Sequence, residues 1–273
     1  MLKDITIGQY FPGESPIHRL DPRMKIVLTT AYIMMLFLAV NPLGLAVGIL
    51  FLVFAYGISK IPAAMIVKSI KPVLPIILFT SILNMFFIDG QILVKWWVFK
   101  ITLQGLTTAI VMSIRIVCLI AGTSLMTYTT SPIALTDGIE RLCSPLKRFK
   151  LPVHELAMMM TIALRFIPTL VEETDKIISA QKARGADLES GGLMQRARAL
   201  IPILIPLFVS AFRRADELAM AMTCRCYRGG EGRTRMKQLK IQLRDINSAV
   251  FVGLCLVAVI AINLYAPVVF TMR

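Results

Sequence analysis

Residues 106–128, LTTAIVMSIRIVCLIAGTSLMTY, form an apolar run of 23 residues whose only charged side chain is Arg115. The hydrocarbon core of a bilayer is about 30 Å thick and is crossed by roughly 20 helical residues. The run therefore predicts a transmembrane helix. Because only helices and closed barrels span a membrane, it also decides the fold class, an all-α membrane protein.

Four other stretches share this apolar character: 26–40, 43–58, 73–88 and 249–270. The first two are separated only by Asn41-Pro42, a turn signal. We expect a tight helical hairpin there; one long helix broken at Pro42 is the alternative. The third stretch follows Lys68 and Lys71, which can anchor its end at the membrane surface. The sequence thus predicts about five transmembrane helices.

The composition agrees with a membrane location. Of the 273 residues, 56% are hydrophobic and 17% charged, whereas soluble domains carry about 25% charged residues. Thirty Lys and Arg against sixteen Asp and Glu leave a net charge of +14. These values argue against an ordinary soluble enzyme and against a disordered basic tail, which would hold fewer apolar side chains.

The charges are concentrated in one block. Residues 131–245 carry 19 basic and 12 acidic side chains, whereas residues 26–127 carry only six basic side chains and Asp89. Five spans with the N-terminus inside place this block in the cytoplasm and Lys95 and Lys100 outside, as the positive-inside rule requires. We expect a cytoplasmic N-terminal segment (1–25), a membrane domain of about four spans (26–130), cytoplasmic coupling helices (131–247) and a C-terminal transmembrane helix (248–273).

Two long amphipathic helices are predicted inside the charged block. Apolar residues recur at alternating steps of three and four, the period of a helix with one apolar face. They are Leu156, Met160, Ala163, Ile167, Leu170, Thr174, Ile177 and, more weakly, Gln181 in the first run, and Met194, Ala197, Ile201, Leu204, Phe208, Ala211, Ala215, Leu218 and Met222 in the second. Each rod of some 30 residues is about 45 Å long. A shorter helix over 135–146 is expected before them.

The rods carry charged doublets that are costly in lipid: Glu172-Glu173, Arg213-Arg214 and Asp216-Glu217. They are therefore not simply additional spans. Their wide, Met-rich stripes suit packing against a partner or the membrane surface. A solvated helical hairpin that closes on itself remains the alternative. Pro168, Pro202 and Pro206 lie inside the runs, where we expect kinks.

Each rod ends in an arginine between small residues, Ala183-Arg184-Gly185 and Cys224-Arg225-Cys226. One interpretation is electrostatic, since a cation near a helix C-terminus is favoured by about 0.3–1 kcal/mol. The other interpretation is that each tip binds a partner separately, because the two arginines are 41 residues apart and separated by a helix. Each guanidinium group would then bind a partner carboxylate in bidentate fashion.

Three other features are weaker candidates. Arg115 lies inside a span, where a charge is a functional candidate with Asp89 as a distant partner, or else bonds to neighbouring carbonyls. Cys224-X-Cys226 suggests a metal, but zinc takes about four ligands and the only histidines, His18 and His154, are remote in sequence. The five cysteines indicate no disulfide framework.

Several stretches together resemble the transmembrane coupling (T) component of energy-coupling factor (ECF) vitamin transporters. They are Leu20-Asp-Pro-Arg-Met-Lys25, Arg165-Phe-Ile-Pro168 followed by Glu172-Glu173, Ala180-Gln-Lys-Ala-Arg-Gly185, and Arg214-Ala-Asp-Glu-Leu-Ala-Met-Ala-Met222 leading into Cys224-Arg-Cys226. The resemblance covers essentially the whole chain. The second tip departs from the commoner Ala-Arg-Gly form in having Cys224 and Cys226 around its arginine.

The resemblance implies that Arg184 and Arg225 lie at the tips of crossed coupling helices and dock in grooves of two cytoplasmic ABC-type ATPases. It implies a second membrane partner, an S component that binds a vitamin or related micronutrient and topples in the bilayer to release it. It also implies a multi-pass protein of a bacterial or archaeal plasma membrane. Substrate choice would belong to the S component, so neither the vitamin nor a shared or dedicated module follows from this chain.

The chain itself is expected to be a non-catalytic subunit without a cofactor. No glycine is followed directly by lysine, so a Walker A loop is absent from the sequence and ATP and Mg²⁺ would be held by the partner ATPases. Two alternatives are a membrane-anchored basic scaffold that binds nucleic acid or anionic lipid, and a membrane-embedded enzyme that uses Arg115 and Asp89. Apolar stripes and 12 acidic residues in the charged block argue against nucleic acid.

Overall fold

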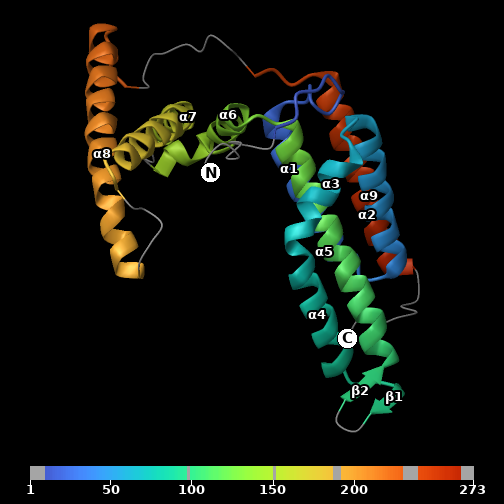
Figure 1. Cartoon of the computed structure of the whole chain (residues 1–273). Helices are drawn as coiled ribbons and strands as arrows, with labels where there is room; N and C mark the ends of the chain where they lie inside the picture. Colours follow the sequence, from blue (N-terminus) through green and yellow to red (C-terminus); the bar gives the residue numbers. More distant parts are fainter. Residues whose placement is uncertain (1–9, 97–98, 150–151, 187–191, 230–238, 266–273) are drawn as a thin grey trace. The chain divides into compact units, whose positions relative to one another are not determined.

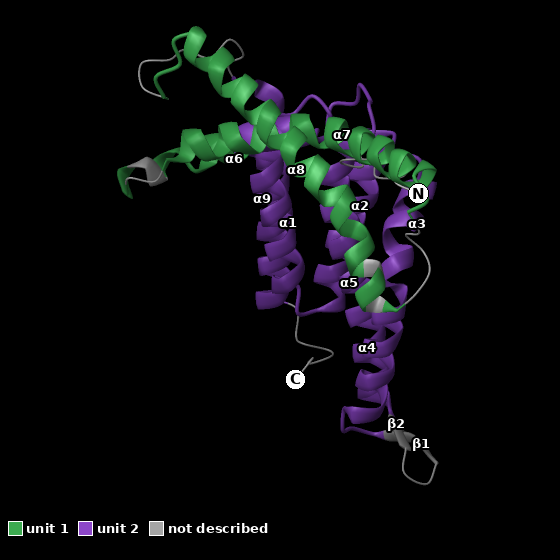
Figure 2. Ribbon diagram, turned by 60° about the vertical axis from the view of Figure 1, so that its left-hand side comes forward, with its two compact units in different colours: residues 1–7, 139–238 green, residues 8–138, 239–273 purple. Residues whose placement is uncertain are grey.

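The computed structural model describes residues 10–96, 99–149, 152–186, 192–229 and 239–265. The chain forms two compact units (Figure 2). The membrane unit comprises residues 8–138 and 239–273, and the crossed-helix unit comprises residues 139–238 with 1–7. The boundary falls inside helix α6 (Pro132–Leu142), and each unit is described by itself.

The membrane unit is built around one long helix, α5 (Leu103–Thr129), which contacts α1, α2, α3 and α4 (Figure 1). Helix α9 packs against α1 and α2 and thereby brings the last described residues beside the first helix. The other elements are α1 (Pro22–Leu38), α2 (Pro42–Ser59), α3 (Ala63–Ile70), the 3₁₀ turn η1 (Lys71–Val73), α4 (Leu74–Phe87), strands β1 (Ile92–Trp96) and β2 (Phe99–Thr102), and α9 (Leu243–Tyr265).

The predicted break between the first two spans is confirmed. Helix α1 ends at Leu38 and α2 begins at Pro42. Each helix has proline in its first turn, where the missing N–H has no intrahelical partner in any case. Asp21 caps α1, its Oδ1 accepting from the Arg23 N–H at 2.9 Å.

Two helical segments begin before the apolar stretches that predicted them. Helical structure of the third span begins at Ala63, ten residues before position 73, so Lys68 and Lys71 lie inside it. Pro72 and Pro75 do not end the helical segment because each occupies the first turn of the next element. Helix α9 starts at Leu243, ahead of the predicted 249, and residues 266–270 of that prediction lie outside the described residues.

A β-hairpin precedes α5 and was not predicted. Strands β1 and β2 pair antiparallel with Ile92 opposite Thr102 and Trp96 opposite Phe99. Thr102 joins the hairpin to the helices, because its hydroxyl donates to the Ile88 carbonyl at 2.7 Å and accepts from the Gly105 N–H at 3.0 Å. Apart from this hairpin, the regular structure of the described residues is helical.

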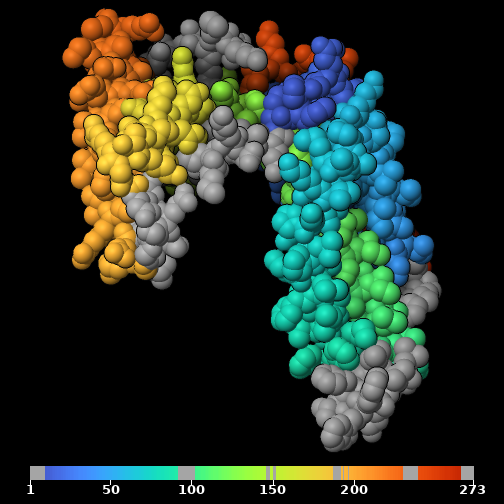
Figure 3. Space-filling view, in the orientation of Figure 1, coloured from blue at the N-terminus to red at the C-terminus, as the bar shows by residue number. Residues whose placement is uncertain are grey.

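Five helical segments in the described residues are long and apolar enough to cross a membrane: α2, the segment 63–87, α5, α7 (Val153–Ala183) and α9. The number agrees with the predicted five, but α7 takes the place of α1, which has 17 residues. Large apolar side chains are exposed on the membrane unit, including Leu50 (69%), Phe79 (63%) and Leu254 (63%). Figure 3 shows α4 at the surface of the drawn face. Such exposure is typical of helices that face lipid.

The core of the membrane unit lies where α1, α2, α5 and α9 meet. Its buried side chains include Tyr32, Leu36, Cys118 and Val259. The ring of Tyr32 stacks on Phe51 with centroids 5.3 Å apart and lies against Gly122, where a Cβ would overlap it. A bulky aromatic residue thus fills the space that a glycine leaves.

The crossed-helix unit contains η2 (Ser144–Phe149), α7 (Val153–Ala183) and α8 (Leu193–Cys224). Both rods predicted over 156–181 and 194–222 are confirmed, and the short helix predicted over 135–146 corresponds to α6 and η2. Helices α7 and α8 cross (Figures 1 and 2). Both continue as α-helix through Pro168, Pro202 and Pro206. Between the rods, the stretch 187–192 (Asp-Leu-Glu-Ser-Gly-Gly) predicts a turn, and residues 187–191 of it lie outside the described residues.

Candidate docking site at two helix ends

Arg184 occupies the C-terminal cap of α7. The N–H of Gly185 donates to the Lys182 carbonyl at 3.0 Å, and the N–H of Ala186 donates to the Gln181 carbonyl at 3.0 Å. This pair of bonds, with Gly185 at φ +83°, is a Schellman motif. The helix therefore ends in a tight turn that fixes the backbone of the arginine.

Arg225 occupies the same position at the end of α8. The N–H of Cys226 donates to the Thr223 carbonyl at 2.9 Å and the N–H of Tyr227 to the Met222 carbonyl at 3.0 Å, which is again a Schellman motif. Here Cys226 takes the left-handed conformation, φ +55°, that Gly185 takes at the first tip. The two arginines are thus held by the same backbone geometry although their neighbours differ.

Both tips present free guanidinium groups. Ala183, Arg184, Gly185 and the stretch 224–226 are exposed. Within the described ranges, the side chains of Arg184 and Arg225 have no hydrogen bond or ion pair. Cys224 and Cys226 are free thiols. An exposed, unpaired guanidinium on a rigid cap is suited to bidentate contact with a partner's carboxylate.

The two tips are far apart within the unit. The side-chain amide of Gln181, three residues before Arg184, donates to the Pro202 carbonyl at 3.1 Å. Cys224 lies 22 residues further along α8, which corresponds to about 33 Å of helix. The two tips cannot form one composite site, as the sequence predicted.

Polar side chains hold the crossing between the tips. Arg214 of α8 lies 3.0 Å from the Glu173 carboxylate of α7 and stacks over the Phe166 ring at 5.8 Å. The Ser210 hydroxyl also donates to Glu173. In the sequence, the doublets that contain Glu173 and Arg214 indicate only that the rods are not simply additional spans, so this contact was not predicted. The signal was their presence in two of the motifs that carry the family resemblance.

Helix α8 is apolar on the side away from α7 as well. Ile203 is buried and lies two helical turns before Ser210, which contacts α7, whereas Ile205 (59%), Phe208 (60%) and Phe212 (68%) are exposed. The last three lie three and four residues apart and so share one face. Ile201, Leu204 and Phe208 of the predicted stripe are among the exposed side chains. This exposed surface, the apolar face of α8, is wide enough to contact a partner.

The Leu20–Lys25 motif ties three helix ends together in the membrane unit. The Asp21 N–H donates to the Asp245 carboxylate of α9 at 2.9 Å, and Arg23 donates to the Leu239 carbonyl at 3.2 Å. Lys25, buried, donates from Nζ to the carbonyl of Thr129 at the end of α5 at 2.7 Å. The motif therefore holds the ends of α1, α5 and α9 together.

Arg115 has a structural partner. Its Nη2 donates to the carbonyl of Ala39 at the C-terminal cap of α1 at 2.6 Å. Asn263 of α9 donates to the adjacent Leu38 carbonyl, also at 2.6 Å. No ion pair joins Arg115 to Asp89 in the part of the chain that the structure describes. The geometry therefore favours the interpretation in which Arg115 bonds to carbonyls at a helix end.

Metal ligands do not gather around the second tip. In the described ranges, no group of three or more His, Cys, Asp or Glu side chains is placed to hold a metal ion. His154 bonds to Glu140 at 3.0 Å within the crossed-helix unit.

The fold and these sites define a multi-pass α-helical membrane protein whose second unit is a pair of crossed helices with arginine-capped ends. A family model described as "CbiQ: Cobalt transport protein" matches residues 13–236. The chain belongs to this family, and within it to the transmembrane components of energy-coupling factor transporters, as the following relatives show.

Each of these relatives is named "Energy-coupling factor transporter transmembrane protein EcfT". The protein from Ruminiclostridium cellulolyticum is 56% identical over 246 residues, 90% of this chain and 92% of the relative. That from Clostridium kluyveri is 53% identical over 270 residues, 98% of each chain. That from Bacillus subtilis is 46% identical over 267 residues, 97% of this chain and all of the relative. The resemblance noted from the motifs is confirmed.

Proposed function

We propose that this chain is the coupling subunit of an ATP-driven vitamin or micronutrient importer and that it docks two ABC-type ATPases through Arg184 and Arg225. One observation carries the proposal. Two arginines with the same Schellman cap stand exposed at opposite ends of one crossed-helix unit, and neither has a side-chain partner in the part of the chain that the structure describes. Two equivalent tips match a pair of similar partner subunits, each of which receives one tip.

The crossing would couple the movements of the two tips. Closure of the ATPase pair on ATP would move both tips together, and the contact of Glu173 with Arg214 and Ser210 would make α7 and α8 move as one body. ATP and Mg²⁺ belong to the partner ATPases in this proposal, and the chain is a non-catalytic subunit without a cofactor. Its contribution is to carry movement.

The substrate-binding S component would contact the apolar face of α8. Ile205, Phe208 and Phe212 are more than half exposed there, which suits an apolar partner that slides or tilts rather than binding in one fixed register. The tilt of the S component would open its vitamin site to the cytoplasm. Arg213 and Asp216, near the end of this surface, carry opposite charges and do not make a track for nucleic-acid phosphates.

The orientation follows from charge. We place the protein in a bacterial or archaeal plasma membrane with the N-terminus and the crossed-helix unit cytoplasmic, because residues 131–245 hold most of the basic side chains. The bilayer is then in contact with the exposed apolar surface of the membrane unit.

The double variant Arg184→Glu with Arg225→Glu tests the docking role. Two carboxylates would repel the acidic groups that are expected to grip the arginines, so we expect loss of ATPase co-purification and of vitamin uptake with normal membrane insertion. Each single Arg→Lys change should weaken uptake because lysine lacks the planar fork. Arg213→Glu is the matched control for ATPase co-purification, since Arg213 is an exposed arginine of α8 away from its tip.

Wild-type uptake by the double variant, or an equal loss of ATPase co-purification in the Arg213→Glu control, would contradict the assignment. Two further results favour other functions. Turnover of a substrate by the purified chain alone would support an enzyme, and purification with nucleic acid in place of an ATPase pair would support a basic scaffold.

A further inference from the structure

The membrane unit contains a cavity of about 360 Å³ to which the docking role assigns no purpose. It lies among α1, α2, α5 and α9, and its lining residues all belong to the membrane unit. Its volume is at the lower end of the range of about 300–1,000 Å³ for small-molecule sites.

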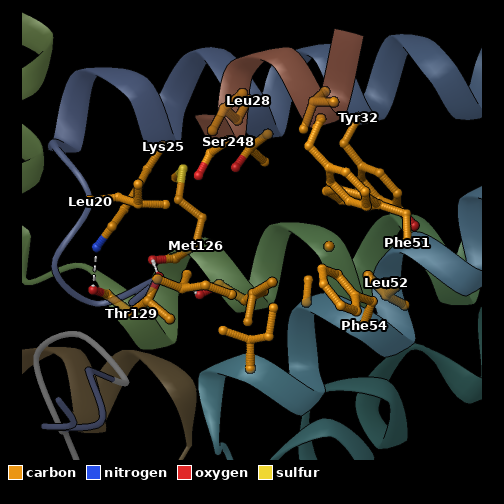
Figure 4. Close-up of a pocket in the computed structure, with 18 of the residues that line it drawn as sticks. Leu20, Lys25, Leu28, Tyr32, Phe51, Leu52, Phe54, Met126, Thr129 and Ser248 are labelled. Carbon is orange, nitrogen blue, oxygen red and sulfur yellow. Dashed lines mark hydrogen bonds between the residues drawn. The ribbon is translucent and has the colours of Figure 1, made fainter. Parts of the chain in front are cut away.

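The two ends of the cavity differ in chemistry (Figure 4). Lys25 and Thr129 lie at one end, where a hydrogen bond joins them. Tyr32 and Phe51 lie at the other. Apolar side chains, among them Leu28 and Met126, line the space between. The cavity therefore matches a molecule with a long apolar part and one polar end.

Lys25 decides the charge of that polar end. Among the described residues it is the only charged one that lines the cavity; the Asp245 carboxylate, whose charge acts on Lys25, does not line it. Nζ donates to the carbonyls of Thr129 at 2.7 Å and His18 at 3.1 Å. An ammonium group has three N–H donors, so one remains for a ligand. A negatively charged group is the natural partner of that donor.

The cavity wall also reaches the surface that faces lipid. Phe54 of α2 and Phe251 of α9 line the cavity and are 54% and 41% exposed, with their rings 5.4 Å apart. Both lie in helices long and apolar enough to span a membrane. The molecules that surround these rings in a membrane are phospholipids.

We propose that the cavity binds the acyl chain of one anionic phospholipid, with the lipid phosphate at Lys25. The apolar lining receives the chain, and the one charged side chain selects the headgroup. A lipid held there would pack α1, α2, α5 and α9 against each other at the end where Lys25 caps α5. This inference does not depend on the docking role of Arg184 and Arg225.

Native mass spectrometry of the full chain, purified in mild detergent and exposed separately to phosphatidylglycerol, phosphatidylcholine and oleate, tests the proposal. We expect one retained phosphatidylglycerol per chain and about tenfold weaker retention of phosphatidylcholine. Lys25→Gln should remove this preference. Ala55→Leu, which extends a side chain into the cavity, should reduce retention of phosphatidylglycerol by at least about tenfold. Ala46→Leu on the exposed side of α2 is the control and should retain the lipid.

A wild-type measurement covers the case in which a variant fails to fold. Phosphatidylglycerol with a photoreactive acyl chain should label Leu28 or Met126. Labelling confined to exposed positions such as Phe79 would overturn the proposal. Equal retention of phosphatidylcholine would overturn the choice of an anionic headgroup, and retention of oleate alone would overturn the choice of a phospholipid. Full retention by a folded Ala55→Leu variant would overturn the location.

Discussion

Cys226 differs from Gly185, the residue at the same position of the first tip, yet the backbone of the second tip has the same geometry. Both tips end in the same pair of capping bonds, yet one has Gly185 and the other Cys226 in the left-handed conformation. A residue with a Cβ is strained there by about 1 kcal/mol relative to glycine. The cap of the second tip is therefore less stable by this strain energy, and it should open more readily than the cap of the first tip.

Cys226→Gly should tighten the second tip. Relief of the strain should stabilise the cap by about 0.5–1 kcal/mol, so exchange of the Tyr227 amide, which bonds to Met222, should slow about two- to fivefold. Hydrogen–deuterium exchange of the full chain measures this. The reciprocal variant Gly185→Ala should speed exchange of the Ala186 amide. Unchanged exchange in both variants would show that the φ angles store no strain.

At this scale the sequence predicted which residues stand at the tips but not how they are held. The small-Arg-small triplets located Arg184 and Arg225, because a helix that loses its apolar period at a glycine ends there. The cap at Cys226 was not predictable, since cysteine carries no preference for positive φ. Arg115 stayed ambiguous because its partner, the Ala39 carbonyl, is 76 residues away.

At the scale of elements, a charged pair joins α7 and α8 where they cross. The apolar period that predicts the two helices does not predict this contact. Glu173 and Arg214 are about one quarter exposed and share contacts with Ser210 and Phe166. The apolar period predicted both helices to within three residues at each end. It could not predict the crossing, because which faces of two helices meet depends on contacts 41 residues apart.

A double-mutant cycle on Glu173→Gln and Arg214→Gln measures the crossing. We expect a coupling free energy of about 0.5–1 kcal/mol, because the pair is partly shielded from water and shares a hydrogen-bonded serine. Glu172 and Arg213, their exposed neighbours in the same doublets, provide the control cycle, for which no coupling is expected. Denaturant unfolding of the full chain in detergent supplies the free energies. Equal coupling in both cycles would contradict the role of Glu173 and Arg214.

Two elements were not predicted because hydropathy alone does not mark them. The hairpin of β1 and β2 has no Gly or Pro turn signal between 92 and 102, so its strands read only as the end of an apolar stretch. Helix α3 was missed because Lys68 and Lys71 interrupt the hydropathy but not the helix. Hydropathy reports which residues tolerate lipid, and a helix can extend beyond them.

At the scale of the whole molecule, the open question is which helices cross the membrane. By length and composition α7 qualifies and α1 does not. Yet the C-terminal half of α7 contains Glu172, Glu173, Asp175 and Lys176, each of which costs about 2.5–3.5 kcal/mol near the centre of a bilayer. Helix α1, with 17 residues, is at the lower end of the range of about 17–25 residues for a spanning helix, and its two ends are held by the Leu20–Lys25 motif and by Arg115. We therefore propose that α1 is the fifth span and that α7 lies in the cytoplasm.

Thiol labelling separates these two topologies. If α1 spans and α7 does not, a membrane-impermeant maleimide should reach Ser179→Cys and the native Cys224 only from the cytoplasmic side, and Gln91→Cys only from outside. If α7 spans, the two ends of α7 lie on opposite sides of the membrane. Ser179→Cys, at the exposed C-terminal end, is then outside the cell together with Arg184. An Arg184 tip outside the cell has no access to cytoplasmic ATPases, so external labelling of Ser179→Cys would contradict the topology and the docking proposal together. If Arg184 and Arg225 dock one pair of cytoplasmic ATPases, both tips must be labelled from the cytoplasmic side.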